Sequence, residues 1–358
     1  MRFLSLFHGL AAALCLMQLS CSQAPREITI NTGTMREALN TASREKKHLM
    51  AVVTYEGCPS CDKLLSAAKH YDTFQEVLDK YVVYRFNAME PGQQWLDQWL
   101  YEKAYPIIIL FSPEGKLLTV IKHGNAGVIK DLAAKALITP ASQELYKHSR
   151  TKLPYGHDTL VRTLAAGFYG HMALQNNAAT PQLREALSGL EKTVTEQPYF
   201  FNYYLLSKLH HKLGDSTESK RFADSALNKK GPLEAVLYPT LRAELKFQND
   251  SSYDQYDDPY VAINETTINI GEVNRNQKPK ATFTIKNIGK QPLLIRDMKV
   301  GCSCTAADWP KKPILPGEET TVTLTYKAAK EGAFTQSAYL LTNAFNSSVH
   351  ITISGFVM

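Results

Sequence analysis

The fold of the N-terminal half is decided by the stretch His48-Leu-Met-Ala-Val-Val-Thr-Tyr-Glu-Gly-Cys-Pro-Ser-Cys61. Its apolar first part predicts a buried strand over 48–55, and we expect a helix to begin at the cysteines and to run through His70. The start of a helix has unpaired backbone N–H groups and the positive end of the helix dipole, so a thiolate at Cys58 would be stabilised there. Pro59 suits the first helical position, because the N–H that it lacks would have no helical partner anyway.

Cys58 and Cys61 form a C-x-x-C pair, a spacing found in redox sites, in zinc sites and in structural disulfides. A thiolate at Cys58 could attack a substrate disulfide, and Cys61, one helical turn along, could then resolve the mixed disulfide. A zinc site would need a second C-x-x-C or an H-x-x-x-H, and the sequence offers neither. We therefore predict a redox-active pair with Cys58 as the exposed nucleophile, keep a structural disulfide as the alternative, and predict no metal ion and no other cofactor.

Strand and helix patterns alternate on both sides of the pair, and they predict one α/β domain over residues 27–139 with a parallel or mixed sheet covered by helices. An amphipathic helix is expected just before the first strand, and a Pro-Glu-Gly turn joins two later strands. The expected elements are a helix at 35–46, a strand at 81–87, a helix at 93–103, strands at 107–111 and 116–122, and a closing helix at 126–137.

This domain resembles the thioredoxin superfamily, in the CPSC motif after a buried strand and in the Tyr105-Pro106 pair before a later one. The resemblance implies a thioredoxin-like fold in which Cys58 and Cys61 are catalytic and Pro106 follows a cis peptide bond opposite them. It also implies that the partners are protein thiols or disulfides. Reductase, oxidase and isomerase activities share this chemistry and differ in redox poise, so the direction stays open.

The sequence departs from the thioredoxin pattern at two places. Glu56-Gly57 replaces the aromatic residue that commonly precedes the first cysteine, and Val52 stands where thioredoxins proper keep a buried acid that assists proton transfer. These departures weaken the expectation of efficient thioredoxin-like reduction.

Residues 155–247 show helical spacing without strand alternation. Within them, 203–215 and 222–227 resemble one tetratricopeptide repeat, and Pro198 and Pro232 are separated by its period of about 34 residues. We expect about two repeats that serve protein docking and that pack on a neighbouring domain, because such arrays usually need three or more repeats for stability. A plain helical spacer is the alternative.

After a polar, acidic linker at 248–260, residues 261–358 alternate over short spans separated by turns, which predicts an all-β, immunoglobulin-like antiparallel sandwich that also serves protein docking. The segment resembles a small immunoglobulin-like family of unknown function found in bacterial envelope proteins, notably in Gly301-Cys-Ser-Cys-Thr305, Trp309-Pro310 and Pro316-Gly-Glu318. That family likeness implies a fold and no activity.

Cys302 and Cys304 are candidates for a secondary redox pair. A bridge between cysteines only two positions apart closes a very small ring, and strained disulfides are more oxidising and more labile than relaxed ones. Such a pair could exchange electrons with Cys58 and Cys61. The alternative is that both are reduced, partly buried residues of the sandwich, because free cysteine often packs as a small apolar group.

The N-terminus has the pattern of an export signal over residues 1–21: Arg2, an apolar run from Phe3 to Leu19, and then Ser20-Cys21. Cys21 resembles the lipid-acceptor cysteine of bacterial lipoproteins, although Gln18 stands where that motif usually has an aliphatic residue. We therefore expect an exported protein of the periplasm or cell envelope that is held to a membrane through a lipid anchor.

Composition agrees with several domains and excludes one class of partner. At 358 residues the chain can form two or three domains, each with its own core. Its formal charge of +6 is spread along the chain without a basic run, so nucleic acid is not expected as a partner. The leading hypothesis is an envelope thiol–disulfide oxidoreductase, and the rival is a non-enzymatic interaction protein in which CPSC is only a stable bridge.

Overall fold

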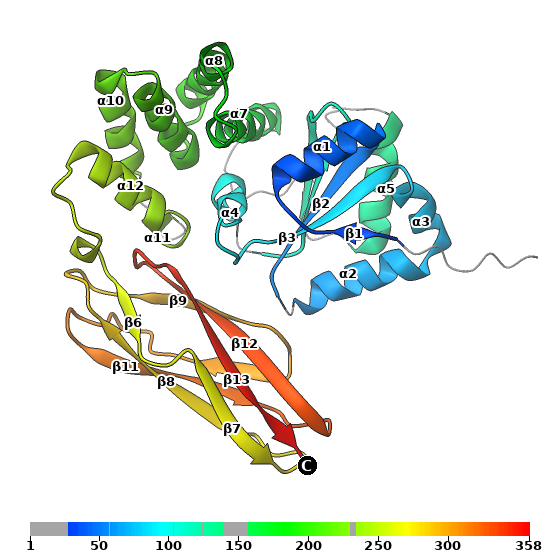
Figure 1. Cartoon of the computed structure of the whole chain (residues 1–358), viewed down its shortest axis with the longest axis vertical. Helices are drawn as coiled ribbons and strands as arrows, with labels where there is room; N and C mark the ends of the chain where they lie inside the picture. Colours follow the sequence, from blue (N-terminus) through cyan, green and yellow to red (C-terminus); the bar gives the residue numbers. More distant parts are fainter. Residues whose placement is uncertain (1–27, 57, 103, 123–124, 139–156, 230–233) are drawn as a thin grey trace, which may run out of the picture.

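The computed structural model describes residues 28–56, 58–102, 104–122, 125–138, 157–229 and 234–358. It has three parts in chain order, a thioredoxin-like α/β domain, a group of helices and an all-β sandwich, which is the predicted fold class (Figure 1). The signal segment and Cys21 lie outside the described residues. Among the described residues, no helix combines the length and the apolar character that crossing a bilayer would require.

The α/β domain is built on a five-stranded mixed sheet with the order β1-β3-β2-β4-β5. The central strand β2 pairs in parallel with β3 and antiparallel with β4. Its strands are β1 (Ile30–Asn31), β2 (His48–Thr54), β3 (Tyr81–Asn87), β4 (Ile107–Phe111) and β5 (Leu117–Lys122). Its helices are α1 (Met35–Glu45), α2 (Pro59–His70), α3 (Asp72–Leu78), α4 (Trp95–Leu100) and α5 (Ala126–Ile138).

Strand β2 is apolar along its length because both of its faces are covered. Met50 and Val52 face the core beneath α2, α3 and α5, whereas Leu49, Ala51 and Val53 face a second core. Such burial on both faces is usual for the inner strands of an α/β sheet.

The second core is shared with the helical part, so the helical segment packs on a neighbouring domain as predicted. Trp99 of α4 is fully buried, and its indole N–H donates to the carbonyl oxygen of Leu164 at 2.8 Å. A Cβ at Gly167 would lie 2.7 Å from Asn202 Oδ1 and 3.2 Å from Trp99 Cδ1, so a side chain there would require Asn202 to shift. The helices are α7 (His157–Gln175), α8 (Thr180–Glu196), α9 (Phe200–Lys212), α10 (Ser216–Leu227), α11 (Glu234–Leu237) and α12 (Pro239–Asn249).

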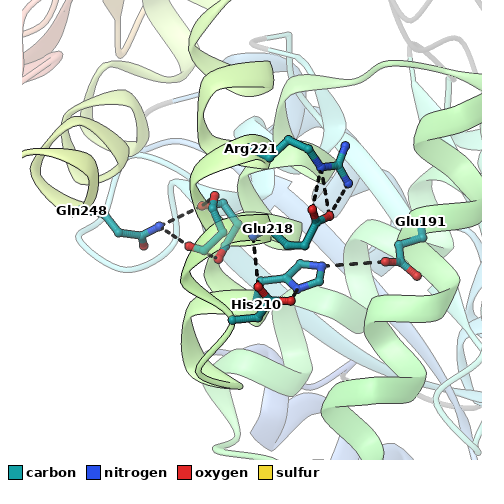
Figure 2. Close-up of polar contacts among 8 residues, drawn as sticks. Glu191, His210, Glu218, Arg221 and Gln248 are labelled. Carbon is teal, nitrogen blue, oxygen red and sulfur yellow. Dashed lines mark hydrogen bonds and ion pairs between the residues drawn. The ribbon is translucent and has the colours of Figure 1, made fainter.

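Buried polar contacts join α9, α10 and α12 (Figure 2). The hydroxyls of Ser207 and Ser219 each donate to the other residue's carbonyl oxygen, at 2.8 and 3.0 Å, and the Gln248 amide donates to both hydroxyls. The contact between α9 and α10 is therefore polar at these two serines. His210 is buried beside Glu191 and its neighbour His211 is exposed. The assignment to tetratricopeptide repeats stays a prediction.

The sandwich consists of two four-stranded sheets with the orders β10-β11-β8-β6 and β7-β13-β12-β9. Pairing is antiparallel, as in the predicted sandwich, except at one edge, where β7 pairs in parallel with β13. The strands are β6 (Val261–Ile263), β7 (Thr267–Val273), β8 (Lys280–Asn287), β9 (Ile295–Val300), β10 (Thr305–Asp308), β11 (Glu319–Tyr326), β12 (Gly332–Thr342) and β13 (Ser348–Val357).

The connection between the helices and the sandwich is short and bonded to both. The Lys246 ammonium pairs with the Asp258 carboxylate at 2.5 Å, and a one-turn helix η1 (Gln255–Asp257) lies between them. A Cβ at Gly289 would lie 2.0 Å from the Asp258 carbonyl oxygen, so only glycine allows this approach of the sandwich to the connection.

Candidate redox site

Cys58 and Cys61 are joined in a disulfide at the point where β2 gives way to α2, with their Cα atoms 5.3 Å apart. Cys58 is the N-cap residue of α2, in extended conformation, and Pro59 occupies the first helical position as predicted. The buried strand and the start of the helix thus hold the first sulfur at the helix N-terminus, where the helix dipole favours negative charge.

Two donors face the Cys58 sulfur. The Cys61 backbone N–H donates to it at 3.3 Å, and the Ser60 hydroxyl lies 3.5 Å from it. The same hydroxyl donates to the Tyr105 carbonyl oxygen at 3.4 Å in the oxidised site. When the pair is reduced, these groups can stabilise a thiolate at Cys58, which is the form of cysteine that attacks disulfides. Sequence reasoning missed Ser60, although its place between the cysteines was the available signal.

The Tyr105–Pro106 peptide bond is cis, as the thioredoxin resemblance implied. The Ser60–Tyr105 hydrogen bond brings this loop against the start of α2, so Cys58, Cys61 and Pro106 belong to one site. The Tyr105 hydroxyl donates to the Asp97 carboxylate. Burial, together with the Asp97 charge, raises the pKa of Tyr105 well above its ordinary value, so the phenol stays protonated.

A buried ion pair lies beside the cis-proline loop and was not predicted. The Lys122 ammonium, at the end of β5, pairs with the Glu102 carboxylate, and their side chains are 0 % and 2 % exposed. Lys122 lies opposite Ile107, the residue after the cis-proline, in the β4–β5 register. Val52, where thioredoxins proper keep a buried acid, belongs here to an apolar core.

Cys58 is only 1 % exposed and Cys61 is fully buried. The prediction that Cys58 would be an exposed nucleophile was therefore wrong for this arrangement of the domains. The sulfur caps α2 instead of projecting from it, and the aromatic residues that flank the site are themselves covered. Next to the pair, a cavity of about 740 Å³ opens between α2 and α5, lined by Ser60, Leu64, Phe74, Pro106 and Lys130 among others.

The β-sandwich contacts the aromatic residues beside the pair. The Tyr55 hydroxyl donates to the Val300 carbonyl oxygen at 3.4 Å, and the Tyr55 ring meets the Tyr105 ring edge-on at a centroid distance of 5.4 Å. Both rings pack against a small apolar cluster that joins Met89 of the α/β domain, Val236 of α11, and Tyr339 and Leu341 of β12. The end of β9 lies below the start of α2 in Figure 1.

Cys302 and Cys304 are paired with each other in the turn between β9 and β10. Both side chains are half-buried, and Ser303 between them is exposed. The redox state of Cys302 and Cys304 stays a prediction. Within the described residues, no three side chains of His, Cys, Asp and Glu gather where they could hold a metal ion.

Two family models match the chain, each over one of its parts. Residues 35–125 match the model of a thioredoxin-like domain, and residues 261–357 match that of a protein family of unknown function, DUF1573. The chain thus contains a thioredoxin-like domain and a C-terminal DUF1573 domain. Thioredoxin-like domains with such a cysteine pair are, as a class, proteins of thiol–disulfide exchange. No curated protein matches the chain.

Several solved structures are similar to single parts of the chain. A thioredoxin from Thermus thermophilus is 14 % identical over 34 % of this chain and 97 % of its own, with a TM-score of 0.29. A putative disulphide-isomerase from Bacteroides thetaiotaomicron is 17 % identical over 31 % of this chain and 94 % of its own, with a TM-score of 0.29. A protein of unknown function from Porphyromonas gingivalis W83 is 15 % identical over 30 % of this chain, with a TM-score of 0.26, and the match spans 51 % of that protein.

Proposed function

We propose that the chain is a thiol–disulfide oxidoreductase of the bacterial cell envelope that acts on protein disulfides through Cys58 and Cys61. The observation that carries the proposal is the Cys58 sulfur at the N-terminus of α2, with the Cys61 N–H and the Ser60 hydroxyl turned toward it. These groups favour the thiolate, and the neighbouring Cys61 is placed to resolve a mixed disulfide. The export-signal pattern supports the envelope, and Cys21 would carry the lipid anchor.

The exchange runs in two steps. A Cys58 thiolate attacks one sulfur of a substrate disulfide, which breaks that bond, forms a Cys58–substrate disulfide and releases a substrate thiol. The Cys61 thiolate then attacks the Cys58 sulfur, which restores the Cys58–Cys61 bond and releases the second substrate thiol. Two electrons and two protons pass to the substrate, and the steps reverse when the substrate is a dithiol.

One observation favours a second candidate, a non-enzymatic interaction protein with a structural Cys58–Cys61 bridge. Both sulfurs are almost inaccessible in the docked arrangement of the domains, and inert structural cysteines are commonly buried. The reduction potential of this pair separates the two candidates. A value above about −270 mV supports exchange chemistry, whereas a structural bridge lies below about −300 mV.

Trapping tests the roles of the two cysteines. A Cys61→Ser protein should accumulate mixed disulfides through Cys58, because the resolving thiol is gone, and a Cys58→Ser protein should not. Equal trapping by both variants would contradict the assignment.

Membrane attachment is tested separately by fractionation. A Cys21→Ala protein should leave the membrane fraction, and its recovery there at the wild-type level would contradict lipidation.

A further inference from the structure

The two cysteine loops of this chain start from residues that are bonded to each other. Tyr55 directly follows β2 and leads to Cys58, whose N–H donates to the Tyr55 carbonyl oxygen at 3.3 Å. Val300 ends β9 and leads through Gly301 to Cys302. The hydrogen bond from the Tyr55 hydroxyl to the Val300 carbonyl oxygen therefore brings together two loops that are 245 positions apart in sequence.

The contact between these loops is backed by packing on both sides. Tyr339 and Leu341 of β12, the strand next to β9, are buried against Met89, and the Ser348 hydroxyl lies 3.9 Å from the Met89 sulfur. The hydrogen bond between Tyr55 and Val300 is thus flanked by buried apolar residues, which hold the two loops in place.

Backbone hydrogen bonds hold the turn that carries Cys302 and Cys304, and Ser303 of this turn is exposed. The Thr305 N–H donates to the Cys302 carbonyl oxygen at 3.1 Å, and the Lys327 N–H donates to that of Cys304 at 2.8 Å. The Cys304 N–H points at the Cys302 sulfur at 2.9 Å, and the Thr305 hydroxyl lies about as close to one sulfur as to the other, 4.0 and 3.9 Å. These donors can stabilise a thiolate that leaves when the bond is opened.

We propose that Cys302 and Cys304 form a second redox centre that exchanges electrons with Cys58 and Cys61 inside the same molecule. Cys58 and Cys61 are buried, whereas Cys302 and Cys304 are half-buried and lie on the loop that follows Val300, so the sandwich pair is the more open of the two. The inference rests on the proposed function of Cys58 and deepens it, because it names the first partner of that site.

The internal step balances without a further reagent once one pair is reduced. A Cys58 thiolate attacks a sulfur of the Cys302–Cys304 bond, which breaks, and a disulfide forms between the domains. The Cys61 thiolate attacks Cys58, the Cys58–Cys61 bond forms, and both sandwich cysteines are left as thiols, with two electrons and two protons transferred. A protein dithiol must reduce Cys58 and Cys61 beforehand, and a protein disulfide reoxidises Cys302 and Cys304 afterwards. Tethering in one molecule raises the effective concentration of each pair toward the other.

Trapping in the full-length protein tests the inference. Cys61→Ser is combined with Cys304→Ser in one protein and with Cys302→Ser in another, so that Cys58 and one sandwich cysteine remain. After oxidation with glutathione disulfide and rapid alkylation, non-reducing peptide mapping should show Cys58 joined to the remaining sandwich cysteine in at least one of the two proteins. Adding Tyr55→Phe, which removes only the hydroxyl bonded to Val300, should slow formation of this link several-fold.

The matched control carries its cysteine elsewhere on the sandwich. It combines Cys61→Ser, Cys302→Ser and Cys304→Ser with Thr282→Cys, an exposed position on β8 in the sheet that lies away from the α/β domain. Links from Cys58 should be about tenfold scarcer in this control than in the better trap. If the traps link no more than the control while Cys58 still forms a disulfide with glutathione, the relay is refuted and the proposed function stands. If Cys58 reacts with neither, the proposed function fails and the relay fails with it.

Discussion

Ser60→Ala should make the Cys58–Cys61 pair harder to reduce. In the oxidised site the Ser60 hydroxyl donates to the Tyr105 carbonyl oxygen at 3.4 Å and lies 3.5 Å from the Cys58 sulfur. On reduction, a Cys58 thiolate becomes the stronger acceptor, because hydrogen bonds to ionised groups are stronger than those to neutral ones. The Ser60 hydroxyl can then donate to the Cys58 thiolate. Alanine lacks the hydroxyl, so it removes this stabilisation of the thiolate from the reduced state alone.

The expected fall in the reduction potential is small, because the contact between the Ser60 hydroxyl and the Cys58 sulfur is long. A hydrogen bond to a charged group contributes about 1.5–3 kcal/mol, and giving up the bond to Tyr105 leaves a net gain of about 1 kcal/mol. For a two-electron couple, this is a fall in the reduction potential of about 20 mV. It also corresponds to about fivefold less thiolate at a pH where the thiol predominates.

The assay is equilibration of the full-length protein in glutathione buffers, with peptide mapping to read Cys58 and Cys61 separately from Cys302 and Cys304. Alkylation of Cys58 by iodoacetamide near neutral pH gives the second readout. Ser60→Thr keeps a hydroxyl at the same place and should stay close to wild type. An unchanged or raised potential in Ser60→Ala, or an equal fall in Ser60→Thr, would refute the reasoning.

Two further predictions concern stability. Lys122→Met removes the ammonium group that pairs with the buried Glu102 carboxylate and should lower the free energy of unfolding by about 3–5 kcal/mol. Adding Glu102→Gln should recover most of the loss, and urea titration of both proteins checks this. Burial lowers the pKa of His171 from 6.5 to about 4. As the pH falls, the unfolded chain therefore takes up a proton at this histidine at a higher pH than the folded chain does. The free energy of unfolding should fall by on the order of 3 kcal/mol between pH 6.5 and pH 4. His171→Phe, which keeps a ring against Trp95, should lose that part of the pH dependence in urea titrations at pH 6.5 and 4.5, and an unaltered slope would contradict it.

The local sequence pattern predicted most helices and strands of the α/β domain, but it did not predict the short ones. The strand expected at 81–87 is β3 with the same bounds, because a run of apolar residues between polar ones needs no tertiary information. In contrast, β1 has two residues and exists only through its pairing with β3. Helix α3 was missed because Tyr71, in extended conformation, separates it from α2 without a glycine or proline to mark the break.

The candidate site was predictable as far as it depends on neighbours in sequence. The C-x-x-C spacing and Pro59 placed the cysteines at a helix start, and the family likeness supplied the cis bond before Pro106. The contact of Tyr55 with Val300 could not be predicted, since the two residues lie 245 positions apart in separate domains. The same holds for the Lys122–Glu102 pair, whose members come from different elements and show no motif.

The sandwich contacts the aromatic side chains that lie beside the cysteine pair. An aromatic residue next to the first cysteine would present an apolar surface to whatever approaches the site. In this chain the aromatic residues nearest the site, Tyr55 and Tyr105, are occupied by the cluster around Tyr339. Recognition of outside proteins must therefore use surfaces that stay open, which are the cavity between α2 and α5 and the half-exposed Cys302–Cys304 turn.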